Sequence, residues 1–403
     1  MAPPRPHPLA RSRASERAGQ LVETLWNRGV TPKPPLDPGF LWYTGSKGFN
    51  PEDERAGRSE AEVADFRDRL ERLCKSLRDE ANLNALGHTM AYGQITSAIR
   101  KRHALGRLWQ EQPGLPQTPV APPIIVVGQM RAGTTRMHRL LAADPAHAGT
   151  LFCNSHDPVP RRPDLRRFKS AAGLAIARRI NPWLDMLHPF GPTRTDEEIG
   201  WLAAALDACT YEAQYTIPAF VAFNEAQDGH AVYREFARLL RTDAAAMGNA
   251  ARPRVMKCPQ FCEHLPALLE QFPEARLVVT HRDHAEVLAS SVSMVAAQMA
   301  FQTDNAVVEA IEAEWRRKLT LRHDRVEAAL ARWSGPVARV DYAGLNADWR
   351  SEIARVYAML GLDLSPAARA AMEDEQAKAA HDAHHAHARD LAQFGERSAD
   401  RFR

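Results

Sequence analysis

The chain has 403 residues, of which 45% are hydrophobic and 25% are charged, a composition typical of an ordinary globular protein with enough apolar content for a core. Lysine and arginine number 52 against 49 acidic residues, and a balance this even gives no support to nucleic-acid binding. No uninterrupted apolar run approaches the roughly 18 residues of a membrane-spanning helix, so no membrane span is expected.

The cysteines are few and odd in number, which excludes a disulfide scaffold and favours a reducing compartment, so the predicted location is the cytoplasm. They are Cys74, Cys153, Cys209, Cys258 and Cys262. The last two are four positions apart without a second cysteine pair, a pattern that does not fit a zinc site. The first twenty residues are rich in proline and arginine and lack an apolar stretch, which argues against a secretory signal.

Three regions follow one another along the chain. Residues 1–55 are punctuated by proline and glycine, which predicts an extended, partly flexible arm with turns. Residues 56–120 carry apolar residues at helical spacing, beginning with Val63, Phe66 and Leu70, and are expected to form an N-terminal segment of two or three helices. Residues 121–403 are expected to form one α/β domain.

Strand and helix signals alternate in the α/β domain. Short apolar or β-branched runs predict strands at Ile124–Val127, Arg254–Met256, Leu277–Thr280 and Val337–Val340. Helices are predicted at Met137–Ala143, His264–Gln271, Ala285–Met299 and Ala306–Trp333. Strands separated by helices predict a parallel sheet flanked by helices and joined by right-handed crossovers.

The loop after the first strand carries the clearest chemical signal. Gly128 and Gly133 have the spacing of a loop whose backbone N–H groups cradle a phosphate at a helix N-terminus. A nucleoside-triphosphate loop continues with a lysine, but here Thr134 and Thr135 follow, and the cation is Arg131. Hydroxyl groups, loop amides and one cation suit a donor that carries a single phosphate beside a sulfuryl group. A nucleotide kinase or other NTPase, and a nucleotide-binding protein with a decayed site, remain the alternatives.

The stretch from Arg131 to Thr135 resembles the donor loop of the sulfotransferases that depend on 3′-phosphoadenosine 5′-phosphosulfate (PAPS), in their bacterial-type branch. That resemblance implies a P-loop NTPase-like fold and PAPS as co-substrate, with no metal. The donor would be bound by Arg131, Ala132, Gly133, Thr134, Thr135 and Arg136.

A second signature supports the same resemblance. Arg282 follows a predicted strand and Ser290 lies eight positions later, the spacing at which the family binds the 3′-phosphate of the donor. A guanidinium makes a forked contact with phosphate, and a serine hydroxyl adds a third donor. Further segments that resemble the family are Val255–Phe261, Val337–Leu364 and His387–Gly395.

Candidates for the chemistry come from the same motifs. Arg131 and the amides of residues 133–136 are expected to stabilise charge at the transferring group, and Lys257, at a predicted strand end, is a second cation for that role. The expected general base is Glu197. Glu198 is the less favoured candidate, because Thr195 and Glu198 have the spacing of a helix capping box, which would occupy the carboxylate of Glu198. The remaining candidates for the base are His156, His188 and His264.

The reaction predicted is in-line transfer of the sulfuryl group to a hydroxyl or amine. The acceptor, a small molecule or a glycan or lipid hydroxyl, is not readable from the sequence, and homo-oligomer formation is left open. Four histidines near the end of the chain, His381, His384, His385 and His387, fit a solvated loop better than a metal site. The resemblance to the family implies that this tail folds over the donor as a lid, and the choice between a lid and a disordered tail is left open.

Overall fold

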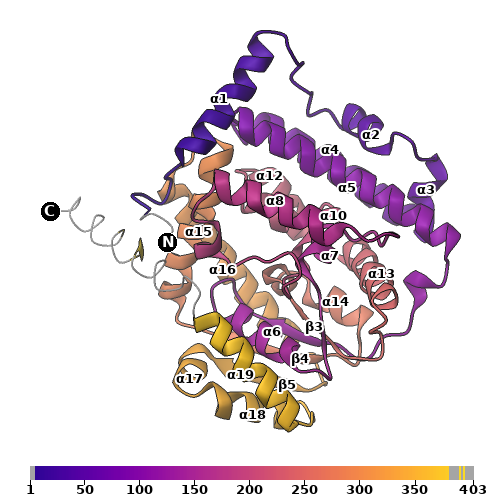
Figure 1. Ribbon diagram of the computed structural model, residues 1–403, viewed down its shortest axis with the longest axis vertical. Coiled ribbons are helices and arrows are strands. Elements are labelled where there is room, and N and C mark those ends of the chain that lie inside the picture. Colours follow the sequence, from indigo (N-terminus) through magenta and orange to yellow (C-terminus); the bar gives the residue numbers. More distant parts are fainter. Residues whose placement is uncertain (1–4, 381–389, 392–393, 395–403) are drawn as a thin grey trace.

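A parallel sheet forms the centre of the α/β region in the computed structural model, which describes residues 5–380, 390–391 and 394 (Figure 1). Within these residues the sheet has five strands in the order β2-β3-β1-β4-β5. The strands are β1 (Ile124–Val127), β2 (Ala148–Gly149), β3 (Arg254–Lys257), β4 (Arg276–His281) and β5 (Val337–Asp341). The α/β class and the four predicted strands are confirmed. The edge strand β2 was not predicted, because two residues carry no periodic pattern.

Both faces of the sheet are covered by helices, which places β1 in the middle of the core. Ile124 and Val126 face α6 (Thr134–Ala143) and α18 (Trp349–Met359), and α19 (Pro366–Ala380) packs on the same side. Ile125 and Val127 point to the opposite face of the sheet, where a second apolar core is formed with a different set of helices. Alternate residues of a strand point to opposite faces, so a strand buried on both sides must be apolar throughout.

The second face is covered by three helices of the domain and by the end of the long N-terminal helix α5 (Ala85–Glu111). The three helices are α13 (His230–Ala246), α14 (Leu265–Gln271) and α16 (Val308–Leu330). Trp109 of α5 is buried there, and its indole N–H donates to Oγ1 of Thr242 at 2.9 Å. The N-terminal helices therefore share a core with the α/β region.

The segment 1–55 is not the extended arm that its proline content predicts. It contains α1 (Arg13–Asn27), α2 (Pro38–Ser46) and α3 (Pro51–Arg55). The prolines of α2 and α3 occupy the first helical position, where a missing N–H costs nothing. Asp37 caps α2 by accepting from the backbone N–H of Phe40 at 2.9 Å. Proline here starts helices rather than interrupting them.

The expected helical segment 56–120 contains α4 (Glu60–Asp79), α5 and the short 3₁₀ helix η1 (Leu115–Gln117). A separate apolar cluster holds α4 and α5 together, with α11 (Ala208–Glu212) and α12 (Pro218–Ala226) packed against it. Ser59 begins α4 with a capping box to Glu62. How the chain divides into domains stays a prediction.

The long stretch of chain between β2 and β3 is mostly helical. Its helices are α7 (Phe152–His156), α8 (Arg166–Ile180), α9 (Leu184–Leu187), α10 (Ile199–Ala204) and the α11, α12 and α13 already given. The apolar run Ile199–Cys209 is divided between α10 and α11 at Leu206, whose φ is 56°. The remaining elements are η2 (Pro259–Cys262), α15 (His284–Gln302) and α17 (Tyr342–Ala347). Among the described helices none combines the length and apolarity needed to cross a bilayer.

Candidate active site

The loop between β1 and α6 is held in a tight conformation by two glycines. Gly133 has a φ of +82° and is the N-cap of α6, and a Cβ there would lie 2.4 Å from the Tyr342 ring. A Cβ on Gly128 would lie 2.2 Å from Oγ1 of Thr280. Arg131 also has a positive φ, 69°. Glycine is therefore required at position 133 by the positive φ and by the contact with α17, and at position 128 by the contact with β4.

The loop residues differ in how they are placed. Met130 and Ala132 are buried against α15, and Thr134 is buried at the start of α6. Thr135 is half-buried with its hydroxyl in contact with Lys257. The side chain of Arg136 donates to Asn346 at 2.6 Å and to Gln376 at 3.0 Å, so only its backbone belongs to the loop.

Arg131, Arg282 and Ser290 are brought together by the fold. Nε of Arg131 donates to Oγ of Ser290 at 2.7 Å, and Nη1 of Arg282 donates to the carbonyl of Arg131 at 3.0 Å. Nη1 of Arg131 also donates to the carbonyl of Leu187 at 2.9 Å. The guanidinium of Arg282 lies over the Tyr342 ring, 4.3 Å from its centroid. The side chain of Arg131 is thus directed toward Ser290.

Among the described residues Arg131 pairs with no acidic side chain, and Arg282 pairs with only one. Burial, and next the neighbouring Arg282, lower the pKa of Arg131. Arg282 pairs with Glu286 at 2.8 Å, but that carboxylate is largely exposed. An excess of positive charge at the amino end of a helix favours binding of an anion.

Lys257 connects the loop to the acidic segment after α9. It ends β3 and is buried, and its Nζ donates to Oγ1 of Thr135 at 3.0 Å and to Oε1 of Glu197. The carboxyl end of β3 lies beside that of β1, because the two strands are parallel and adjacent. The predicted cation and the predicted base are therefore in direct contact.

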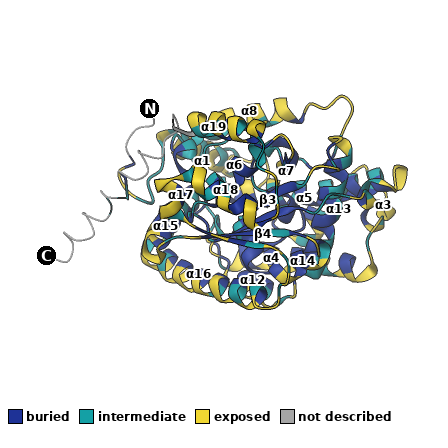
Figure 2. Ribbon diagram, turned by 90° about the horizontal axis from the view of Figure 1, so that it is seen from below, coloured by how far each residue is buried: buried dark blue, intermediate teal, exposed yellow. Residues whose placement is uncertain are grey.

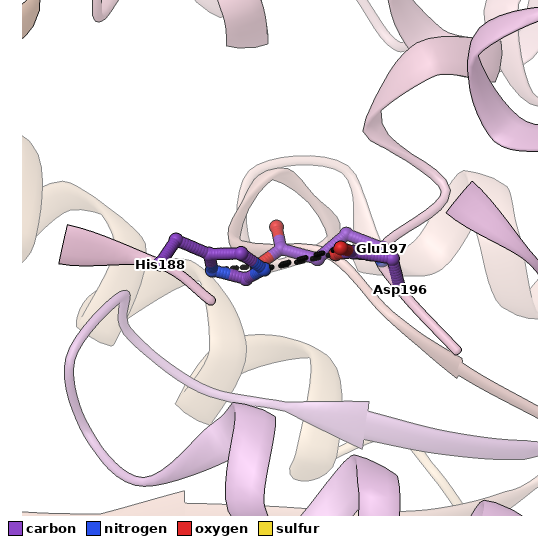
Figure 3. A group of neighbouring side chains, drawn as sticks. All are labelled: His188, Asp196 and Glu197. Atoms are coloured by element: carbon purple, nitrogen blue, oxygen red, sulfur yellow. Dashed lines mark hydrogen bonds and ion pairs between the residues drawn. The ribbon is translucent and has the colours of Figure 1, made fainter. Parts of the chain in front are cut away.

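Glu197 belongs to a small cluster with His188 and Asp196 (Figure 3). Nε2 of His188 lies 3.0 Å from Oδ1 of Asp196, and its Nδ1 lies 3.9 Å from Oε1 of Glu197. Burial alone would raise the pKa of Asp196, but His188 and the N–H of Glu197 outweigh it and hold that pKa below its usual range. Because Asp196 is ionised, the Nε2 of His188 carries the proton that it donates.

Glu198 has a different role from the one that its sequence position predicts. It is fully buried, and its Oε2 accepts from the backbone N–H of Lys257 at 2.9 Å. Thr195 is in an extended bridge with Leu151, and Glu198 is itself the N-cap of α10 without a side-chain capping bond. The predicted capping box is wrong, because burial directs the carboxyl of Glu198 toward β3.

The environment of Glu198 is the driest of the acidic segment. Burial raises the pKa of its carboxyl to about 7, and hydrogen bonds from Lys257 and Thr150 offset only part of that effect. Glu198 thus helps to hold the strand end that carries Lys257, while Glu197 faces the site.

Charges that converge in this way suit the transfer of an anionic group. Loop amides, the hydroxyl of Thr135 and the ammonium of Lys257 can hold the group, and Glu197 or His188 can take a proton. His188, Asp196 and Glu197 also offer ligand atoms within 4.8 Å of one another, as a metal site would. The ammonium of Lys257 already balances the charge of Glu197.

The comparisons with known proteins decide the family. The sequence profile of the sulfotransferase family matches residues 122–366, more than half of the chain. The chain belongs to the sulfotransferase family. The matched residues include the loop, the acidic segment, Lys257, Arg282 and Ser290. Membership makes this protein a transferase and disfavours the kinase alternative.

Two bacterial sulfotransferase structures resemble this sulfotransferase. Sulfotransferase STF1 from Mycobacterium tuberculosis H37Rv is 27% identical, with a TM-score of 0.75 over 85% of this chain and 94% of that chain. Sulfotransferase STF9 from Mycobacterium avium shares the fold at 19% identity, with a TM-score of 0.74 over 86% of this chain and 89% of its own. No curated protein sequence gives a significant match to this sulfotransferase.

Among the described residues, the other two histidine candidates of the sulfotransferase form no hydrogen bond or ion pair with Lys257. The ring of His156 contacts that of Phe152 at a tilt of 43°, with the ring centroids 4.4 Å apart. His264 is buried beside Tyr233 of α13, and burial lowers its pKa. The lid prediction for the histidines near the end of the chain concerns positions outside the described residues.

Three site residues were missed by reasoning from the sequence. The ring of Tyr342 packs on Gly133 and on the guanidinium of Arg282. The hydroxyl of Thr280 leaves no room for a side chain at position 128. The carboxylate of Asp196 orients the ring of His188. Thr280 and Tyr342 lie near the carboxyl ends of β4 and β5, and the edge formed by such strand ends is the usual binding edge of a parallel sheet. That rule applied to every predicted strand would have found them.

Proposed function

We propose that this sulfotransferase uses PAPS as donor and transfers its sulfuryl group in line to a hydroxyl or amine of a small-molecule, glycan or lipid acceptor. One observation carries the proposal: Lys257 contacts Thr135 of the loop and Glu197 at the same time. A cation, loop amides and a carboxylate therefore meet at one point, which is what transfer of an anionic group requires.

In this proposal the two ends of the donor occupy two clusters. The amides of residues 133–136 and the N-terminus of α6 hold the 5′-phosphosulfate. Arg282 and Ser290 bind the 3′-phosphate, and Arg131 assists them, since its guanidinium already contacts Ser290 at 2.7 Å. Lys257, rather than Arg131, then neutralises the charge that develops between sulfur and the leaving phosphate.

Glu197 is the proposed general base. Its carboxylate is paired with the ammonium of Lys257 in the protein without donor. When the donor is bound, Lys257 turns its hydrogen bond toward the sulfuryl oxygens, and Glu197 is released to accept the proton of the acceptor hydroxyl. The transition state is loose, so positioning and charge neutralisation supply most of the rate.

His188 is the second candidate for the base, on a specific observation. Its Nε2–H is held by Asp196 at 3.0 Å, which leaves Nδ1 free of that contact and 3.9 Å from Glu197. A histidine oriented by a carboxylate is a common general base. Glu198 is excluded from this role because it is fully buried beneath Lys257.

The location that we propose is the cytoplasm. All five cysteines are free and buried, as expected for a protein kept in a reducing compartment.

The test is transfer of labelled sulfate from PAPS to a panel of sugars, phenols, sterols, lipids and small alcohols. We expect labelled product with at least one acceptor class, and a rate that is lower by roughly 10²–10³ with Lys257→Met. Tight binding of 3′-phosphoadenosine 5′-phosphate without transfer to any compound would favour a decayed site. Transfer of phosphate from ATP would contradict the proposal.

A further inference from the structure

Helix α8 turns an apolar face to the outside of the molecule. Phe168 is 58% exposed and Ile176 is 63% exposed, and Leu165 just before the helix is 49% exposed. At 100° per residue these two helical positions share a face with the exposed alanines at 171, 172 and 175. Arg166 and Leu174 point inward and are buried. A surface helix normally places its apolar face inward, so this one is reversed.

Exposed cations surround this apolar face. Arg162, Arg167, Lys169 and Arg179 are exposed and form no ion pair with any residue that the structure describes. The helix contains no acidic residue. The other basic residues of residues 161–179 are paired with Asp157, Asp164 and Asp185.

The charge decides what can cover this face. A second copy meeting it across a two-fold axis would place the same unpaired cations opposite one another, which is unfavourable. An anionic lipid surface complements the cations and accepts the apolar side chains between the headgroups. We propose that α8 docks this protein on anionic lipid surfaces.

The helix is placed and anchored for such docking. It lies on the outside of the fold and is largely exposed along its length (Figures 1 and 2). At its carboxyl end Arg178 pairs with Asp185 at 2.7 Å and donates to the carbonyl of Phe190 at 2.9 Å. Ser12 donates to the carbonyl of Ile180. The contacts of Arg178 tie α8 to the segment that carries His188, and the contact of Ser12 ties it to the start of α1. Docking of the helix therefore carries the whole protein with it. The proposal does not rest on the identity of donor or acceptor.

The experiment is cosedimentation of the full chain with vesicles. Vesicles of phosphatidylcholine with about one third phosphatidylglycerol should bind the protein, and pure phosphatidylcholine should not. Arg167→Gln with Lys169→Gln should lower the partition constant about 25-fold, since each cation near an anionic surface contributes roughly a fivefold factor. Phe168→Ser with Ile176→Ser should lower binding at least as much, because insertion of apolar groups is lost.

Matched variants elsewhere on the surface control for unspecific effects. Val307→Ser removes a side chain that is 52% exposed just before α16. Arg28→Gln with Arg332→Gln removes two exposed cations. Neither variant should change vesicle binding. Circular dichroism and the melting temperature show that each variant is folded. Equal binding to both kinds of vesicle, or α8 variants that bind like the parent, would overturn the proposal. So would a dimer in solution that the Phe168→Ser and Ile176→Ser variant abolishes.

Discussion

The ammonium of Lys257 donates to the hydroxyl of Thr135 across 3.0 Å, although the two residues are 122 positions apart in the chain. The same ammonium also contacts Glu197. Adjacent parallel strands produce this arrangement, since Lys257 ends β3 and Thr135 lies one loop beyond β1. Each of the predictions below tests one contact of this site.

Lys257→Met should lower kcat by roughly 10²–10³, the usual effect of losing one donor that stabilises the transition state. Binding of 3′-phosphoadenosine 5′-phosphate should change little. Because the substitution leaves Glu197 without its cation, the variant should also lose stability, and Lys257→Met with Glu197→Gln should recover part of it. Kinetics, calorimetry and thermal unfolding measure the three effects.

The control for this variant is Lys75→Met, which removes a 71% exposed lysine side chain and should change neither kcat nor stability. An unchanged kcat in Lys257→Met would show that Lys257 takes no part in the chemistry.

Glu197→Gln should lower kcat by roughly 10²–10⁴ with nucleotide binding intact, the scale of losing a general base. His188→Gln keeps a polar side chain beside Asp196 and should lower kcat less. If instead His188→Gln is the inactive variant and Glu197→Gln turns over normally, His188 is the base. Steady-state rates for both variants across pH separate these outcomes.

Glu198 gives the stability a pH dependence of known sign. Its pKa in the folded protein is about 7 against an ordinary value of 4.5, so between these values the folded state holds a proton that the unfolded state has released. The stability that Glu198 contributes is therefore complete below pH 4.5 and is lost as the pH rises through 7. The loss should be roughly 2–4 kcal/mol.

Chemical denaturation from pH 4.5 to 8 tests this slope by comparison with Glu198→Gln. Glutamine can still accept from the N–H of Lys257 but does not titrate, so the variant should gain stability relative to the parent as the pH rises. Parallel curves for the two proteins would show that Glu198 does not titrate in this range.

Arg282→Ala should weaken binding of 3′-phosphoadenosine 5′-phosphate by roughly 2–4 kcal/mol, because a charged, forked contact is removed. Affinity for adenosine 5′-phosphate should stay unchanged. Arg350→Ala is a matched control, since Arg350 also lies over an aromatic ring and pairs with a glutamate. Calorimetry with both nucleotides is the measurement, and an equal loss for the two nucleotides would contradict a 3′-phosphate contact.

Gly133→Ala should destabilise the protein by more than the roughly 1–2 kcal/mol that a positive φ costs an alanine, because the added Cβ meets Tyr342 at 2.4 Å. Gly248→Ala isolates the backbone cost: its φ is +64° and nothing lies within 4 Å of the added Cβ. Combining Gly133→Ala with Tyr342→Ala should relieve the clash alone. If Gly133→Ala and Gly248→Ala lower the melting temperature equally, the contact with Tyr342 is not limiting.

Local sequence patterns were enough for the central architecture. Short apolar runs such as Ile124–Val127 identify buried strands, and the spacing of Gly128 and Gly133 identifies the tight loop that follows. The α/β class and the position of the loop were therefore predicted correctly. The arm at 1–55 was predicted wrongly, because proline at the first position of a helix looks the same in sequence as proline in a turn.

Side-chain partners depend on packing between distant elements, and these only the tertiary structure decided. Glu198 has the spacing of a capping residue, yet burial against β3 gives it the N–H of Lys257. Arg131 was expected at the transferring group, yet its guanidinium lies on Ser290, 159 positions away. The sequence by itself determined which residues could carry charge and where strands end. Which charges meet was decided by the order of strands in the sheet, because that order sets the distances between groups that no local pattern encodes.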